Sequence, residues 1–263
     1  MAKIPRTLQY IEVETCSACT RNCNWCLYGH YKDFKERGNQ ILENHYIEQV
    51  FNDLAGNGYK GTIGLFSMNE PLLDERITNG SLLELGRSIF ENQVSFHLTT
   101  NGDLLTDDIL KTLFSSGLSR LIISCYDDQM LERGSYFTKN NFDVVILDKR
   151  YFQTGSWEYN RAGSVDCNND NHLNYQSCYL PMFQSVIGWD GEVRLCCHDA
   201  LGTMKIGNIK ENSLFEILTN NSFDELRKSI RNNRTSIEPC KSCNYGGRIE
   251  DILEPFPTYE ANL

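Results

Sequence analysis

Long apolar runs are missing from this sequence of 263 residues. It contains no stretch of about 18 consecutive apolar residues, and its first residues lack the apolar core of a signal peptide. We therefore expect a soluble, cytosolic protein that has no membrane partner. Positive charge is also scarce, because 25 Lys and Arg stand against 35 Asp and Glu, a net charge of -10. An acidic surface repels a polyanion, so nucleic acid is not an expected partner.

Low-complexity segments and internal repeats are also lacking. The composition, with 40% hydrophobic and 23% charged residues, is typical of a globular protein. The length allows one sizeable core and a small appendage. We expect a main domain over residues 1–150, a bridge rich in Asn, Tyr, Gly and Ser over residues 151–177, and a C-terminal domain over residues 178–263.

Short apolar runs alternate with helical patterns in the first half of the chain. The predicted strands are 10–13, 62–66, 94–98, 121–125 and 142–147, and the predicted helices are 41–54, 82–90 and 106–114. This alternation favours an α/β fold with a parallel sheet built from right-handed crossover units. Active-site loops then follow the carboxyl ends of the strands.

The pattern changes after residue 178. Two apolar segments, 184–187 and 192–195, flank Asp190-Gly191, a pair typical of a tight β-hairpin. Short helices are predicted at 213–218 and 223–230, with Ser213 and Ser222 as their N-caps. The C-terminal domain is therefore expected to be a β-hairpin followed by helices.

Eleven cysteines occur without an export signal, and a reducing cytosol disfavours disulfides. Metal or cluster ligation is the leading explanation. Cys16, Cys19, Cys23 and Cys26 are close enough in sequence for several sulfurs to converge on one soft metal centre. Their gaps of two, three and two residues match neither a pair of zinc knuckles nor the bacterial ferredoxin spacing.

Cys19, Cys23 and Cys26 form the pattern Cys-x3-Cys-x2-Cys, with Trp25 before the last cysteine. This pattern, directly after a predicted first strand, resembles that of the radical S-adenosylmethionine superfamily. The resemblance implies a partial (β/α)6 barrel and a four-iron four-sulfur cluster, held by these three cysteines, whose open iron binds S-adenosylmethionine. Cleavage of S-adenosylmethionine then yields a 5'-deoxyadenosyl radical that takes hydrogen from a substrate C–H bond.

Companion motifs follow the next three predicted strands. The segment Ser-Met-Asn-Glu-Pro-Leu resembles the Gly-Gly-Glu-Pro segment of the superfamily, and Thr-Thr-Asn-Gly and Ile-Ser-Cys-Tyr-Asp occupy the later positions. The resemblance implies contacts to S-adenosylmethionine from Asn69, Glu70, Asn101, Ser124 and Arg133. The structural alternative for Glu70 is a helix cap or a surface carboxylate.

A second group of cysteines comprises Cys178, Cys196, Cys240 and Cys243. Their spacing by itself allows either zinc or an iron-sulfur cluster. The pattern Cys-x12-Gly-x4-Cys followed by one Cys-x2-Cys resembles the twitch domain, the short form of the SPASM domain of radical enzymes. That resemblance implies a second, auxiliary four-iron four-sulfur cluster held by all four cysteines.

The remaining candidates concern the substrate. Arg161, in the bridge, is a candidate substrate contact, and Cys125 and Cys167 are candidate donors of a hydrogen atom to a substrate radical. A structural role is the alternative for each of them. Cys197 is expected to be a buried thiol that cannot join the ligands beside it, because neighbours on a strand face opposite sides. Cys16 is expected to be a bystander.

Three functions compete. The first is oxidation or epimerisation of a small polar substrate, such as an aminocyclitol or sugar, in natural-product biosynthesis, with a flavodoxin- or ferredoxin-type reductant. The second is maturation of a ribosomally made peptide. About nine residues precede the first predicted strand, so a separate protein would have to recognise the peptide. The third is an electron carrier or zinc-bound interaction module, which leaves the motifs at successive strand ends unexplained.

Overall fold

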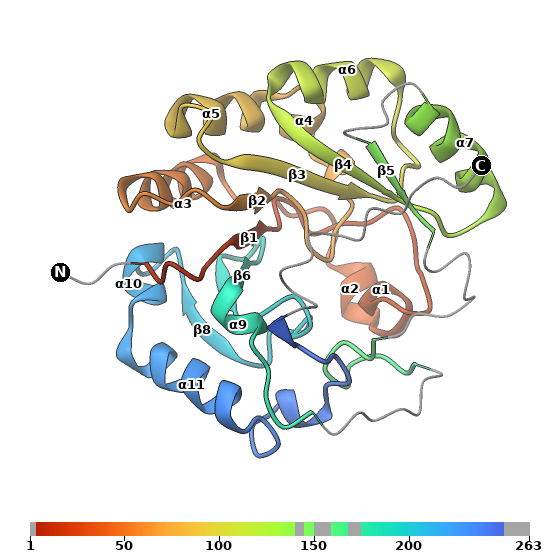
Figure 1. The fold of residues 1–263 in the computed structure, drawn as a ribbon. Helices are drawn as coiled ribbons and strands as arrows, with labels where there is room; N and C mark the ends of the chain where they lie inside the picture. The colour runs from red at the N-terminus through yellow and green to blue at the C-terminus, as the bar shows by residue number, and fades with distance from the viewer. Residues whose placement is uncertain (1–3, 140–144, 150–158, 168–174, 250–263) are drawn as a thin grey trace.

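The computed structural model describes residues 4–139, 145–149, 159–167 and 175–249. One eight-stranded sheet organises these residues, in the order β5-β4-β3-β2-β1-β6-β7-β8 (Figure 1). The strands are β1 (Tyr10–Val13), β2 (Thr62–Gly64), β3 (Ser95–Thr100), β4 (Leu118–Ser124), β5 (Val145–Asp148), β6 (Gln184–Ile187), β7 (Glu192–Arg194) and β8 (Lys205–Asn208). Pairing is parallel from β5 through to β6 and antiparallel from β6 to β8. The predicted α/β class with a parallel, open barrel-like sheet is confirmed.

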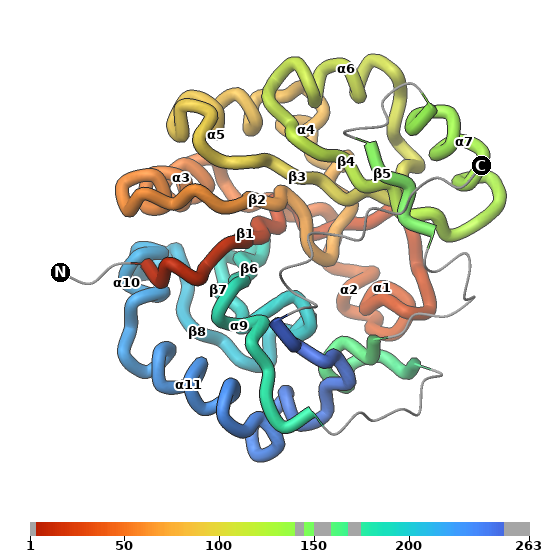
Figure 2. The backbone as a smooth tube through the Cα atoms, in the orientation of Figure 1, coloured from red at the N-terminus to blue at the C-terminus, as the bar shows by residue number. Residues whose placement is uncertain are grey.

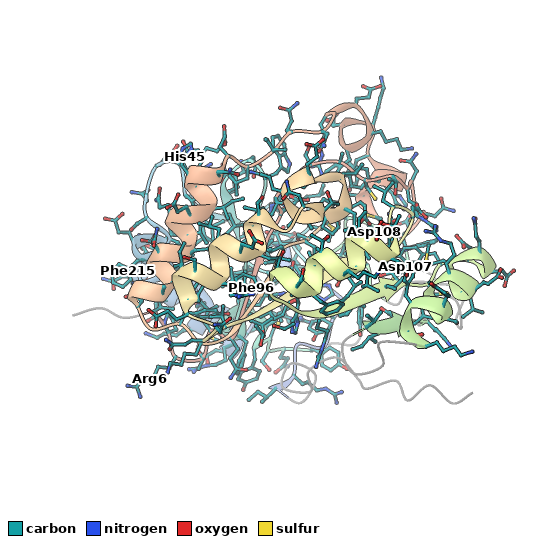
Figure 3. All side chains as sticks on the ribbon, turned by 90° about the horizontal axis from the view of Figure 1, so that it is seen from above. Arg6, His45, Phe96, Asp107, Asp108 and Phe215 are labelled. Atoms are coloured by element: carbon teal, nitrogen blue, oxygen red, sulfur yellow. The ribbon has the colours of Figure 1, made fainter. Side chains whose placement is uncertain are left out.

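Helices connect the strands of the parallel part, and α10 and α11 follow β8. The helices are α1 (Leu27–His30), α2 (Lys32–Glu36), α3 (Asn44–Gly56), α4 (Glu75–Thr78), α5 (Ser81–Phe90), α6 (Asp107–Ser116), α7 (Asp128–Lys139), α9 (Leu180–Phe183), α10 (Leu214–Leu218) and α11 (Asn221–Asn232), with short 3-10 turns η1 (Pro71–Leu73) and η2 (Cys240–Ser242). Helices α3, α5 and α6 lie in a row along one face of the sheet (Figure 3). Within the described part of the chain, no helix is long and apolar enough to cross a membrane.

Helix α5 packs very closely on the sheet. Its inward side chains Leu82, Leu83 and Phe90 are buried in the main core. Gly86 lies on the same helix directly against the Phe96 ring of β3, which Figure 3 labels beneath the helices. A Cβ atom on residue 86 would come within 2.2 Å of that ring. The contact therefore requires glycine because of the close approach of helix and strand.

The C-terminal segment completes the sheet. Strand β6 pairs in parallel with β1, and the register places Gln184 opposite Tyr10. In Figure 2 the tube of β6 accordingly lies beside that of β1, although the two strands come from distant parts of the sequence. The predicted hairpin is present as β6 and β7, and β8 extends it to three strands. The sheet is thus continuous across the two parts that the sequence separates.

Several predicted boundaries hold and one cap is wrong. Thr106 caps α6, and Ser213 forms a full capping box with Glu216 at the start of α10. Helix α11 begins earlier than expected, since the Asn220 side chain, not that of Ser222, accepts the capping hydrogen bond. Residues 142–144 of a predicted strand, much of the predicted bridge (150–158 and 168–174) and the end of the chain (250–263) lie outside the described residues.

Candidate functional site: two cysteine centres at the sheet edge

The first cysteine loop follows β1 and leads into α1. Cys19, Cys23 and Cys26 are partly exposed free thiols. Burial, followed by the neighbouring Cys26 and Cys19 thiols, raises the pKa of Cys23 to about 12. The three thiols thus act on one another electrostatically. Iron bound to thiolates would offset the cost of ionising such buried sulfurs.

Two loops at the carboxyl ends of β2 and β3 hold the cysteine loop in place. The backbone N–H of Glu70 donates to the Ala18 carbonyl at 2.9 Å. The Asn101 side-chain amide donates to Thr20 Oγ1 at 2.8 Å and to Cys19 Sγ at 3.7 Å. Asn101 therefore contacts one of the three predicted ligands directly.

Glu70 is buried, and both of its carboxylate oxygens are engaged within the protein. Oε1 accepts from Thr100 Oγ1 at 2.6 Å and from the Leu72 N–H at 3.0 Å, while Oε2 accepts from the Asn101 N–H at 2.8 Å. Burial raises the pKa of Glu70 to about 7, against the effect of these hydrogen bonds. Glu70 also caps η1, which is the structural alternative that the sequence left open. The side chain ties together the loops after β2 and β3.

Cys16 and Asn69 form a further link in this part of the site. Asn69 Nδ2 donates to Cys16 Sγ at 3.3 Å, and the Cys16 thiol donates to the Glu70 carbonyl at 3.6 Å. Asn69 Oδ1 accepts from the Ser67 N–H at 2.9 Å. Cys16, which we expected to be a bystander beside the three ligands, therefore holds the loop after β2 through its sulfur.

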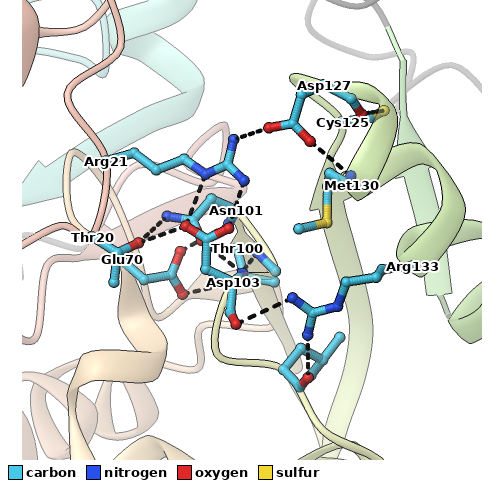
Figure 4. A network of polar contacts seen from close by, with 12 residues as sticks. Thr20, Arg21, Glu70, Thr100, Asn101, Asp103, Cys125, Asp127, Met130 and Arg133 are labelled. Atoms are coloured by element: carbon cyan, nitrogen blue, oxygen red, sulfur yellow. Dashed lines mark hydrogen bonds and ion pairs between the residues drawn. The ribbon is translucent and has the colours of Figure 1, made fainter.

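A charged network joins the cysteine loop to the ends of β3 and β4 (Figure 4). Arg21 donates to both carboxylate oxygens of Asp103, from Nε at 2.8 Å and from Nη2 at 2.5 Å. Its third nitrogen, Nη1, donates to Asp127 Oδ2 at 2.7 Å. Arg133 of α7 donates to the carbonyls of Asp103 and Leu105, at 3.3 and 3.0 Å. Sequence reasoning missed Arg21, Asp103 and Asp127, although charged residues in the loops after three of the strands were a usable signal.

Ser124 ends the strand β4 and Cys125 directly follows it. The side chains of the two residues have different partners. Ser124 is hydrogen-bonded to Tyr126, whose ring centroid lies 5.3 Å from that of Trp25 in the cysteine loop. Cys125 is buried in the apolar core, and its thiol donates to the Asp127 carbonyl at 3.7 Å. The strand end therefore directs Ser124 toward the cysteine loop and Cys125 into the core.

All four cysteines of the second group line one pocket. Cys178, Cys196, Cys240 and Cys243 share it with His198, Asp199, Arg234 and Tyr245, among others, and it encloses about 330 Å³ including space open to solvent. Arg234 braces the pocket by donating to the Cys243 and Tyr245 carbonyls. In the described residues, no three His, Cys, Asp or Glu side chains are placed to hold a single metal ion. A cluster spreads its thiolates around a larger metal core than one ion does.

The Arg161 turn rests against this pocket. Arg161, Ala162 and Gly163 all have left-handed backbone angles, with φ of 48°, 53° and 84°. Holding two non-glycine residues in the left-handed region of backbone conformation costs free energy. Such strained residues are common at functional sites. The turn is held by two reciprocal hydrogen bonds between Asn160 and Asn244, at 2.9 and 3.2 Å.

Cys167 lies beyond this turn. Its sulfur accepts a hydrogen bond from Asn244 Nδ2 at 3.3 Å, and Asn244 directly follows Cys243. Cys167 is therefore beside the second cysteine group, away from the core position of Cys125.

Glu12 is a buried carboxylate that sequence reasoning missed. It is 6% exposed, and it accepts hydrogen bonds from Ser67 Oγ at 3.0 Å and from Gln184 Nε2 at 2.7 Å. Burial raises its pKa to about 7, and the positive charge of Arg161 opposes part of that rise. An acidic residue within the apolar strand Tyr-Ile-Glu-Val was the available signal.

Glu12 lies between the two cysteine centres. Ser67 belongs to the loop that contacts the first cysteine loop through Asn69 and Cys16. On the other side, the side-chain oxygen Oε1 of Gln184 accepts from the N–H of Cys197, which follows the pocket residue Cys196. The arrangement offers a proton acceptor between the two groups of cysteines.

Comparison with known proteins agrees with this geometry. Residues 13–126 match the radical SAM superfamily, and residues 178–244 match the iron-sulfur cluster-binding domain called SPASM. The chain is 28% identical over 240 residues to an S-adenosyl-L-methionine-dependent 2-deoxy-scyllo-inosamine dehydrogenase of Niallia circulans, covering 89% of this chain and 92% of the relative.

Solved structures give the same result. A crystal structure of BtrN in complex with AdoMet and 2-DOIA matches with a TM-score of 0.77 and 26% identity, over 93% of this chain and 95% of that one. Streptococcus suis SuiB bound to S-adenosylmethionine shares the fold alone, with a TM-score of 0.55 and 13% identity over 84% of this chain and 68% of SuiB.

The donor sets fit the cofactors of these families, because each centre gathers cysteine sulfurs, the usual ligands of iron-sulfur clusters. The predicted cofactors, S-adenosylmethionine and four-iron four-sulfur clusters, accord with both matched domains. Residues 13–126 thus carry a radical SAM domain and residues 178–244 a cluster-binding SPASM domain, and these matches, together with the likeness to an S-adenosylmethionine-dependent dehydrogenase, support a radical SAM oxidoreductase.

Proposed function

We propose that this enzyme oxidises a carbinol carbon of a small polar substrate, such as an aminocyclitol, to a ketone in natural-product biosynthesis. The likeness to an inosamine dehydrogenase along almost its whole length supports this proposal. The single observation that carries it is Glu12, a buried carboxylate with a pKa of about 7 between two cysteine centres. Alcohol oxidation requires such an acceptor for the hydroxyl proton.

We assign Cys19, Cys23 and Cys26 to the cluster that binds S-adenosylmethionine. The four pocket cysteines, Cys178, Cys196, Cys240 and Cys243, are assigned to the auxiliary cluster. When bound, these groups supply the 5'-deoxyadenosyl radical and an acceptor for the second electron. We place the domain boundaries at residues 150 and 177, which leaves the Arg161 turn between the two units.

The chain's own residues bind and deprotonate the substrate in this proposal. The Glu12 carboxylate takes the hydroxyl proton, and the guanidinium of Arg161 offers hydrogen bonds to the same hydroxyl oxygen. Asn101 and Ser124 are proposed to contact S-adenosylmethionine. Glu70 and Arg133 act through the loops that they hold, since their polar atoms bond within the protein.

Epimerisation is a second candidate function, favoured by Cys197. Cys197 is half-buried, the charges of Glu12 and Arg161 act on its thiol, and its backbone N–H donates to Gln184 Oε1. A thiol in that position can return a hydrogen atom to a substrate radical. Cys125 and Cys167 are weaker candidates for the same role, because Cys125 is in the core and Cys167 bonds Asn244.

The cellular setting follows from the cysteines. All eleven are free thiols, as expected in the reducing cytoplasm. We place the enzyme there, with a flavodoxin- or ferredoxin-type protein as electron donor. A separate peptide-recognition protein belongs to the peptide-maturation alternative and is not needed for a small substrate.

The test is anaerobic reconstitution followed by incubation with S-adenosylmethionine, dithionite and two substrate sets, aminocyclitols and short peptides. We expect 5'-deoxyadenosine release and a ketone product with an aminocyclitol. Deuterium uptake into unoxidised substrate from heavy water would favour epimerisation instead. Turnover of peptides alone would overturn the proposal.

Glu12→Gln tests the proton acceptor directly. The variant keeps the size of the side chain but cannot accept the hydroxyl proton as a carboxylate does. We expect ketone formation to fall by about 100-fold or more, while release of 5'-deoxyadenosine falls much less. Equal loss of both products would show that Glu12 acts before hydrogen abstraction.

A further inference from the structure

Gln184 joins two parts of the proposed site. Its side-chain amide is buried, and Nε2 donates to Glu12 Oε1 at 2.7 Å. Its Oε1 accepts the N–H of Cys197 at 3.2 Å. Only one orientation of the amide satisfies both partners, because the flipped group would face a carboxylate with its oxygen and an N–H with its nitrogen. The two contacts therefore fix the side chain.

The sheet explains why Gln184 reaches Glu12. Gln184 pairs with Tyr10 across the β1 and β6 strands, and Glu12 lies two residues further along β1 on the same face. The contact spans 172 positions in the sequence. On its other side, Cys197 directly follows Cys196, which lines the pocket of the auxiliary centre.

We propose that Gln184 is a positioning residue that links the proton acceptor Glu12 to the polypeptide of the auxiliary centre, so that proton and electron leave the substrate together. This inference rests on the proposed oxidation. After hydrogen abstraction the carbinol radical would lose its O–H proton to the Glu12 carboxylate, and an auxiliary cluster held by the four pocket cysteines would accept the accompanying electron. The C–O bond becomes C=O.

Charge balance favours such a link. An electron adds negative charge on the pocket side, and protonation removes the negative charge of Glu12. The sum therefore stays constant in a buried region where an additional uncompensated charge is costly. Glu12 also interacts electrostatically with other titratable or charged groups, namely Tyr10, Glu14, Arg161, Arg194 and Cys197.

The first test needs no substrate. In the reconstituted enzyme, the midpoint potential of the auxiliary cluster is measured by redox titration with electron paramagnetic resonance between pH 6 and 8. We expect the potential to fall as pH rises through the titration of Glu12. Glu12→Gln should abolish this dependence. A wild-type potential that does not change with pH would overturn the proposal.

Gln184→Met and Ser67→Ala form the matched pair. Each removes one hydrogen bond donated to Glu12, but only Gln184→Met also breaks the link to Cys197. Both should shift the acid limb of ketone formation to higher pH, by about one unit, because the carboxylate loses a donor. Gln184→Met alone should also weaken the pH dependence of the auxiliary potential and raise the ratio of 5'-deoxyadenosine to ketone several-fold.

The outcomes separate this inference from the proposed function. Identical potentials and product ratios in the two variants would refute the positioning role of Gln184. A potential that depends on Glu12 and Gln184, without oxidation of any carbinol, would refute the proposed reaction and leave the link intact. Iron content and absorbance of each variant, compared with wild type, establish that both clusters are bound.

Discussion

Glu12 and Glu70 are carboxylates in surroundings that disfavour their charge. Each has a pKa of about 7, because burial removes the water that would stabilise the anion. The hydrogen bonds of the two carboxylates serve different purposes. Glu70 uses both oxygens to hold loops, whereas Glu12 has two donors and the nearby charge of Arg161. The same residue type therefore serves structure in one place and is a candidate for chemistry in the other.

The raised pKa of Glu12 predicts a pH-dependent stability. Between its ordinary value of 4.5 and about 7, the folded protein binds this proton more tightly than the unfolded chain does. The contribution is fully present below pH 4.5 and is lost as pH rises through about 7. Glu12→Gln should flatten the fall in the free energy of unfolding between pH 5 and 8 by about 3 kcal/mol.

Denaturant unfolding of both proteins at several pH values measures this difference. Glu70 retains its own slope in the same direction, so the variant keeps part of the pH dependence. Parallel curves for wild type and variant would contradict the burial of Glu12 in the folded protein.

At the scale of elements, local sequence signals placed most strands and helices correctly. β1 occupies its predicted residues, and Ser213 caps the helix that it was expected to cap. These features depend on neighbours within a few residues, and so they are readable from sequence. α7 and β8 were missed, and the hydrogen bonds of Asn220 rather than Ser222 decided the start of α11.

The contact of α5 with β3 makes a prediction at this scale. Gly86→Val should lower the free energy of unfolding by about 1–3 kcal/mol or more, because the added atoms overlap the Phe96 ring and force the helix away from the sheet. Gly56→Ala is the control, since a Cβ on residue 56 meets no atom within 4 Å. Thermal or denaturant unfolding measures both. Equal stability of the two variants would contradict the close approach.

The whole molecule is held together by one sheet that contains strands from both ends of the described chain. Because β6 pairs with β1, Gln184 lies beside Glu12 and connects it to Cys197, the neighbour of the pocket residue Cys196. The first group is reached from Glu12 through Ser67 and the loop after β2. The two centres are thus linked through short polar contacts within one fold.

Removal of the auxiliary ligands tests this division of roles. A double variant, Cys240→Ala with Cys243→Ala, should lose about half of the iron and all ketone formation. It should still cleave S-adenosylmethionine with dithionite, because the first cysteine loop is untouched. Cys197→Ala is the control, since Cys197 adjoins Cys196 but is not a lining residue of the pocket. Full iron content in the double variant would contradict the assignment of these ligands.

The sequence by itself determined the cysteine spacings, the alternation of strands and helices, and the helix caps, because each depends on residues close together in the chain. Only the tertiary structure decided that Gln184 meets Glu12, that Cys16 supports the loop after β2, and that Gly86 touches Phe96. Such contacts join distant segments, and a carboxyl pKa depends on the water that packing removes. Both are set by the folded chain as a whole.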